Sequence, residues 1–176
     1  MTNGSLLIRE FLEADCVIIA HAFAAQGWNK PEAQYRRYLD ECRAGTRVVL
    51  VAEWGAESAR QFAGYICILW ESDYPPFREA AIPEIADFNV LRAYQRRGIG
   101  AALMEEAERR LTVRSPIAGL GVGLTANYGA AQVLYAQRGY VPDGRGLYRA
   151  GHHLLPGEQV VADDDLNLFL TRRVRE

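Results

Sequence analysis

The decisive stretch of this chain reads Pro83-Glu84-Ile85-Ala86-Asp87-Phe88-Asn89-Val90, then Leu91-Arg92-Ala93-Tyr94, then Gln95-Arg96-Arg97-Gly98-Ile99-Gly100, then an amphipathic run to Leu111. It predicts a strand, a tight basic turn rich in glycine, and a helix. Such a turn directs backbone N–H groups at one point, and the start of a helix adds partial positive charge. This combination binds an anion, most often a phosphate or pyrophosphate. A strand that ends beside a pyrophosphate can also present a reactive thioester, which indicates an acyl-CoA-using enzyme.

Other uses of the glycine turn fit less well. Taken alone, Gly98-Ile99-Gly100 fits an ordinary strand–helix connection about equally well. A P-loop needs Gly-Lys followed by Ser or Thr, and a dinucleotide fingerprint needs a third glycine, where this chain has Ala101-Ala102-Leu103. A different nucleotide-binding module that uses the same turn remains a weaker alternative.

The rest of the chain alternates between strand and helix patterns. We expect strands at 6–9, 47–53, 62–70, 83–90, 117–125, from 140 onward, and at 165–172, with helices at 12–25, 31–44, 98–111 and 127–138. Residues 71–82 are expected to be irregular, and His152-His153 to lie in an exposed loop. This order predicts an α/β (α+β) fold with a mixed, partly antiparallel sheet flanked by helices. A single domain over 1–176 is expected.

Composition excludes several classes of protein. The formal net charge is −2, whereas nucleic-acid binders usually carry a basic excess. No apolar stretch approaches the length of a membrane span, and the N-terminal residues do not resemble a secretory signal. The three cysteines are far apart and odd in number, which suits reduced thiols in the cytoplasm. The histidines and cysteines form no metal-binding pattern, so no metal is expected.

A second stretch narrows the prediction. It reads Asn127-Tyr128-Gly129-Ala130-Ala131-Gln132-Val133-Leu134-Tyr135-Ala136-Gln137-Arg138-Gly139-Tyr140. With both stretches in view, the chain resembles the GNAT superfamily of N-acetyltransferases over at least Pro83 to Val141. The first stretch is similar to the family's motif A, with its Arg/Gln-x-x-Gly-x-Gly/Ala turn. The second is similar to motif B. Arg92 departs mildly from the pattern, since many members carry proline there.

The resemblance implies a GNAT-like fold, acetyl-CoA as co-substrate, and roles for particular residues. The strand end would pair its backbone with the pantetheine arm, near a bulge where the strand splays from its neighbour, and an N–H near Val90 would polarise the thioester carbonyl. Asn127 would bind the pantetheine or a phosphate, and Tyr135 would protonate the departing thiolate. The predicted cofactor-binding residues are Phe88, Asn89, Val90, Gln95, Arg96, Arg97, Gly98, Ile99, Gly100, Ala101 and Asn127.

The acceptor amine must lose a proton before it attacks, so a base or a water chain is needed. Glu84 is the first candidate, because it lies fourteen positions before Gly98, as a catalytic glutamate does in some GNAT members. Asp87 is the second, and regular strand alternation would place it on the opposite face.

The segment that begins at Trp70 is aromatic and acidic, so it is a candidate for binding a cationic amine. The residues proposed for substrate binding are Trp70, Glu71, Asp73 and Tyr74.

The predicted activity is direct transfer of an acetyl group from acetyl-CoA to an amine. A small cationic acceptor is favoured, and a peptide N-terminus is the other acceptor considered. The alternative function is a non-catalytic acyl-CoA-binding regulatory domain. No nucleic-acid or membrane partner is expected, and assembly into a homodimer is left open.

Overall fold

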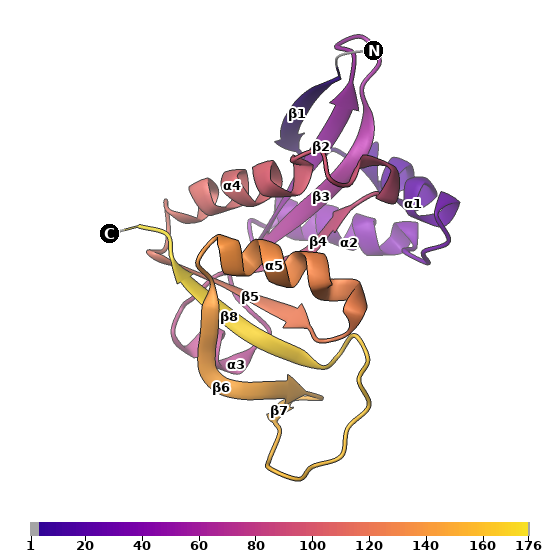
Figure 1. The fold of residues 1–176 in the computed structure, drawn as a ribbon. Coiled ribbons are helices and arrows are strands. Elements are labelled where there is room, and N and C mark those ends of the chain that lie inside the picture. Colours follow the sequence, from indigo (N-terminus) through magenta and orange to yellow (C-terminus); the bar gives the residue numbers. More distant parts are fainter. Residues whose placement is uncertain (1–3, 176) are drawn as a thin grey trace. The chain divides into compact units, whose positions relative to one another are not determined.

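The computed structural model describes residues 4–175 and contains helices and strands in the predicted order. The strands are β1 (Ser5–Glu10), β2 (Arg47–Gly55), β3 (Gln61–Leu69), β4 (Glu84–Val90), β5 (Ile117–Gly123), β6 (Val141–Arg149), β7 (His152–His153) and β8 (Asn167–Arg173). The helices are α1 (Asp15–Ala25), α2 (Glu32–Arg43), α3 (Pro75–Glu79), α4 (Ile99–Leu111) and α5 (Gly129–Gln137), with 3-10 turns at Arg92–Tyr94 and Ala126–Tyr128 (Figure 1).

The described chain divides into two compact units. The first comprises the described residues up to Trp70 together with Ala86–Arg110. The second comprises Glu71–Ile85 and the described residues from Leu111 onward. Strand β4 contributes residues to both units, so each unit contains part of the decisive stretch.

In the first unit, β1, β2 and β3 form an antiparallel meander. Alternate residues of β2 and β3, such as Val49 and Cys67, face the apolar side chains of α1 and α2. The rings of Phe23, Tyr35 and Tyr65 are fully buried there and meet edge to face. Helices α1 and α2 lie side by side (Figure 1). This core supports the loop between α1 and α2. That loop contributes to the site described below.

Helix α1 begins at Asp15, three residues later than predicted. The buried Asp15 carboxylate accepts the N–H of Leu12 at 2.7 Å and pairs with Arg9 at 2.7 Å. A carboxylate held in this way closes a turn before the helix and also stabilises the helix start. Apolar periodicity alone could not reveal this turn.

In the second unit, β5 and β8 pair antiparallel, β8 pairs with β6, and β6 with β7. Glu84 and Ile85 at the start of β4 pair parallel with β5. The mixed, partly antiparallel α/β fold is therefore confirmed.

Two local predictions were wrong. Within 71–82, Pro75–Glu79 forms the short helix α3, because proline suits a first helical turn and Phe77 anchors the helix on β5. A Cβ at Gly119 of β5 would lie 2.3 Å from the Phe77 ring, so glycine makes room for this contact.

His152 and His153 form strand β7 rather than a loop. Only His152 is exposed, and His153 lies against the Tyr148 ring. A two-residue strand is too short to show a periodic pattern in the sequence.

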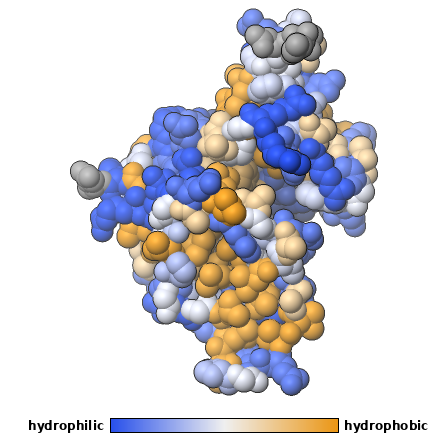
Figure 2. All heavy atoms as spheres, viewed as in Figure 1, coloured by the Kyte–Doolittle hydropathy of each residue, from blue (hydrophilic) through white to orange (hydrophobic). Residues whose placement is uncertain are grey.

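The second unit also presents apolar surface. Its large exposed hydrophobic residues are Val113, Leu124, Val133, Val141, Leu155, Val160 and Val161. Figure 2 shows hydrophobic side chains gathered in the lower half of the view. Isolated exposed apolar residues are ordinary on protein surfaces, whereas a contiguous patch of them is less common.

Candidate active site

The glycine turn has the backbone geometry that the sequence predicts. Arg96 and Gly98 have φ of +58° and +80°, and α4 begins at Ile99. The side-chain amide of Gln95 donates to the Val90 carbonyl at 3.1 Å, which ties the turn to the end of β4. Residues Gln95 to Gly98 are exposed. The left-handed backbone conformation of Arg96 and Gly98 turns the chain, so that successive N–H groups point to the same side of the turn.

The N–H groups of this turn have room for a ligand. The first backbone hydrogen bond recorded after Gln95 joins the Ala102 N–H to the Gly98 carbonyl at 3.0 Å. Within residues 4–175, the N–H groups of 96–101 have no acceptor. A Cβ built at Gly98 would meet nothing within 4 Å. An open cradle of backbone donors at a helix start fits a diphosphate.

The end of β4 packs closely on its neighbours in the first unit. The Phe88 ring lies 3.2 Å from the position of a Cβ at Gly100, so glycine lets the helix start approach the strand. A Cβ at Gly64 of β3 would lie 2.6 Å from the Asn89 carbonyl oxygen. A larger residue at Gly64 would clash with the backbone of the strand end, and one at Gly100 would press on the tip of the Phe88 ring.

Asp87 interrupts the regular conformation of β4. Its φ is +41°, an uncommon value for a residue other than glycine, although aspartate tolerates it better than most. The alternation of faces assumed for Glu84 and Asp87 therefore does not hold through this residue. Backbone irregularities of this kind cluster at functional sites.

A network of donors surrounds the Asp87 carboxylate. They are Lys30 Nζ at 2.6 Å, Asn89 Nδ2 at 2.9 Å, Tyr38 Oη at 2.9 Å, Gln34 Nε2 at 3.1 Å and the Tyr65 hydroxyl. Burial acts to raise the pKa of Asp87, but the Lys30 charge and these hydrogen bonds outweigh it and lower the pKa. A carboxylate that is so fully engaged is poorly suited to accept a proton.

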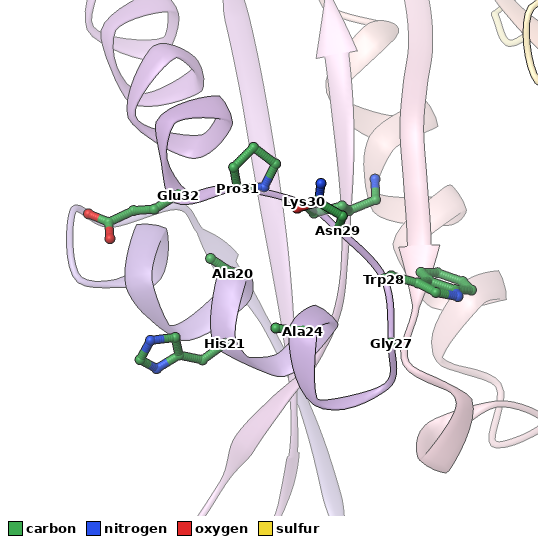
Figure 3. Close-up of a pocket in the computed structure, with 9 residues that line it drawn as sticks. All are labelled: Ala20, His21, Ala24, Gly27, Trp28, Asn29, Lys30, Pro31 and Glu32. Atoms are coloured by element: carbon green, nitrogen blue, oxygen red, sulfur yellow. The ribbon is translucent and has the colours of Figure 1, made fainter.

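Lys30 belongs to the loop between α1 and α2. Its Nζ also donates a hydrogen bond to the Tyr65 hydroxyl oxygen at 3.0 Å and lies 5.4 Å from the Phe23 ring centre. The loop borders a surface hollow of about 490 Å³. Figure 3 shows His21 and Glu32 on one side of this hollow, and the Lys30 side chain directed away from them.

In the second unit, Glu84 has a defined partner. The Ser72 hydroxyl donates to Glu84 Oε2 at 2.5 Å and accepts the N–H of Tyr74 at 3.0 Å. Ser72 is 1 % exposed. The first candidate base is therefore partly buried and held by a hydroxyl.

The aromatic and acidic segment is only partly available to a substrate. Glu71 and Asp73 are exposed, and Trp70 is half-buried. Tyr74, however, is 2 % exposed and stacks on Phe169. Its ring therefore does not present a face to a cation from solvent, because the ring completes an aromatic cluster.

The motif B residues lie on the second unit. Asn127 is exposed in the 3-10 turn before α5. Tyr135 is buried on α5, with its ring centre 6.0 Å from that of Tyr140. Burial raises the pKa of Tyr135, so its hydroxyl keeps its proton at neutral pH, as a proton donor must.

Sequence reasoning missed Lys30, Tyr65 and Ser72. Lys30 is the single lysine of the chain, which was a signal that could have been noticed. Tyr65 lies within an apolar strand pattern, and Ser72 within an irregular segment, so neither had a distinguishing pattern.

Comparison with known proteins agrees with this geometry. A family model described as "Acetyltransferase (GNAT) domain" matches residues 45–142, more than half of the chain. The chain therefore belongs to the GNAT family, whose members use acetyl-CoA as co-substrate. The predicted family and the class of enzyme, an acetyl-CoA-dependent N-acetyltransferase, are confirmed. No curated protein matches the chain significantly.

Solved structures share the fold at low sequence identity. The ribosomal-protein-alanine N-acetyltransferase of Brucella melitensis is 21% identical, with a TM-score of 0.65 and coverage of 95% of this chain and 99% of that one. The yncA protein of Salmonella typhimurium, solved with its cofactor acetyl-CoA, is 19% identical, with a TM-score of 0.64 and coverage of 97% and 95%. A spermidine N-acetyltransferase SpeG chimera from Vibrio cholerae and hSSAT is 14% identical, with a TM-score of 0.66 and coverage of 96% and 95%.

Among residues 4–175, no cluster of His, Cys, Asp and Glu could hold a metal ion. None of the helices in the described part of the chain has the length and apolar character needed to cross a bilayer.

Proposed function

We propose that this protein transfers the acetyl group of acetyl-CoA directly to a primary amine, with a small cationic molecule as acceptor. The observation that carries the proposal is the open cradle of N–H groups at 96–101. Acetyl-CoA supplies the acetyl group as an activated thioester. In this proposal, the cradle binds the diphosphate, and the backbone of Phe88 to Val90 binds the pantetheine arm.

The proton transfers are assigned to two residues of the second unit. Glu84 accepts a proton from the amine, directly or through water, because Asp87 is saturated with donors and has a lowered pKa. Tyr135 donates a proton to the departing sulfur, since a tyrosine hydroxyl is protonated at neutral pH and burial raises the pKa of this one further. Asn127, which is exposed, is proposed to bind the cofactor.

The cationic acceptor is supported by the exposed carboxylates of Glu71 and Asp73, which follow the half-buried Trp70. Carboxylates and ring faces recognise ammonium groups. Two of the structural neighbours are named for spermidine and for a ribosomal protein's alanine, so a small amine and a protein residue both occur as named acceptors on this fold. The acidic side chains favour the small cation.

The free thiols support a reducing compartment. Cys16 and Cys67 are buried and unbridged, and Cys42 is half-buried and also unbridged. We therefore place the protein in the cytoplasm, where thiols stay reduced. The proposal is compatible with a single domain over 1–176 and with assembly into a homodimer.

Calorimetry with acetyl-CoA, followed by a panel of amines with detection of the free CoA thiol, tests this function. We expect binding, and thiol release that depends on the amine and is fastest with polyamines or other small cations. Binding without turnover across the panel would favour the non-catalytic acyl-CoA-binding domain. Absence of binding at millimolar acetyl-CoA would overturn the proposal.

A further inference from the structure

Ser72 occupies an unusual position for a residue of a polar connection. It is 1 % exposed, and its hydroxyl both accepts a hydrogen bond from Tyr74 N–H at 3.0 Å and donates one to Glu84 Oε2 at 2.5 Å. A hydroxyl that accepts one bond from a fixed donor has its own proton directed elsewhere. Here that proton points at Glu84.

Ser72 is supported by Tyr74, which is buried and makes several contacts within the second unit. The Tyr74 ring lies parallel to Phe169 with ring centres 3.6 Å apart. The Tyr74 hydroxyl contacts Asp143 Oδ2 and His153 Nε2, each at 2.7 Å. Strands β6, β7 and β8 therefore hold Tyr74, and Tyr74 holds Ser72. Arg78 of α3 adds a bond to the Ser72 carbonyl at 3.4 Å.

We propose that Ser72 is a positioning residue that orients the Glu84 carboxylate for proton transfer. The inference rests on the proposed role of Glu84 as base. A directed hydroxyl on Oε2 limits the rotamers of the glutamate and so fixes the position of its carboxylate, which proton transfer requires. The segment after Trp70 then serves as a support for the base, in addition to any contact that Glu71 and Asp73 make with an acceptor.

Replacement of Ser72 by alanine tests this role. We expect Ser72→Ala to lower kcat about tenfold, the effect of losing one hydrogen bond to a charged group, with the KM for acetyl-CoA unchanged. Ser115→Ala is the matched control. Ser115 is also a buried serine of the second unit, 5 % exposed, and its hydroxyl donates to the Ile117 carbonyl and accepts the Ile117 N–H. This control should keep the wild-type kcat.

A double-mutant cycle separates positioning from a general structural effect. In the Glu84→Gln background, Ser72→Ala should cause little further loss, because a residue that acts through Glu84 has nothing left to orient. An equal loss in both backgrounds would overturn the inference while leaving Glu84 as base. A wild-type rate in Glu84→Gln would instead refute the proposed base.

A crystal structure of Ser72→Ala provides a readout that does not depend on turnover. We expect the Glu84 side chain to adopt another rotamer or several. A carboxylate that stays in place, with Ser115→Ala as the reference, would contradict the inference even if no amine substrate were found.

Discussion

At the scale of single residues, the proposed chemistry depends most directly on the Tyr135 hydroxyl. Tyr135→Phe keeps the buried ring and removes only the proton donor. We expect kcat to fall about 100-fold, in the range of general acid catalysis, while the dissociation constant for acetyl-CoA stays the same. Steady-state kinetics and calorimetry measure the two quantities. Tyr140→Phe, a buried neighbour with its ring centre 6.0 Å away, is the control, and equal losses in both variants would remove Tyr135 from the mechanism.

The sequence motifs led to the predictions for Glu84 and Tyr135, which stay predictions, whereas residues whose proposed role depends on a distant partner could not be predicted from sequence. Glu84 and Tyr135 follow from their spacing within the two motifs. Ser72 could not be found, because a serine in a loop gains its role only when the fold brings Glu84 to it. Tyr74 was assigned to the acceptor because it is aromatic, whereas the structure uses its ring to fill a core.

The turn between β4 and α4 is the feature that matters at the scale of the element. Gly98 has φ of +80°, and a Cβ there would meet nothing within 4 Å, so alanine affects only the backbone conformation. The left-handed conformation costs alanine about 1–2 kcal/mol, which corresponds to about a tenfold weaker acetyl-CoA affinity if the cradle shifts to relieve it.

Calorimetry on Gly98→Ala checks this expectation, and Gly157→Ala is the matched control. Gly157 has φ of +85° and equally open surroundings, in the segment between β7 and β8. Both variants should lose similar thermal stability, but only Gly98→Ala should bind acetyl-CoA more weakly. Unchanged affinity in Gly98→Ala would show that the cradle does not hold the cofactor.

Elements with a long periodic pattern were predictable, and short ones were not. The strands 47–53 and 62–70 and the helix to Leu111 correspond closely to β2, β3 and α4. Helix α3 and strand β7 depend on contacts with distant residues, such as Phe77 on Gly119 and Tyr74 with His153. The local sequence carries too little information to predict such elements.

At the scale of the whole molecule, the Asp87 network links global stability to pH. Its pKa is lowered on folding, so its contribution is complete above the unfolded pKa of about 3.9 and is lost as pH falls through the folded value. We expect Asp87→Asn to be less stable at neutral pH by about 3 kcal/mol, as for loss of one partner of a buried pair, and this difference to shrink below about pH 4.

Chemical denaturation from neutral pH to about pH 2.5 measures this difference. Asparagine tolerates the positive φ of Asp87, so the variant isolates the charge from the backbone. Asp73→Asn, which removes an exposed carboxylate, is the control and should follow the wild type. A stability difference that stays constant down to the lowest pH would mean that the Asp87 charge is not what stabilises the fold.

The ion pair between Lys30 and Asp87 bears on whether acetyl-CoA can acylate the enzyme itself. Of the 20 Lys and Arg residues, only Lys30 is a lysine, and its ammonium is paired with Asp87 at 2.6 Å. Arginine stays protonated and is a poor nucleophile. A catalyst of amine acylation thus carries a single side-chain primary amine, and because a carboxylate pairs with that amine, we expect it to react slowly with acetyl-CoA during turnover.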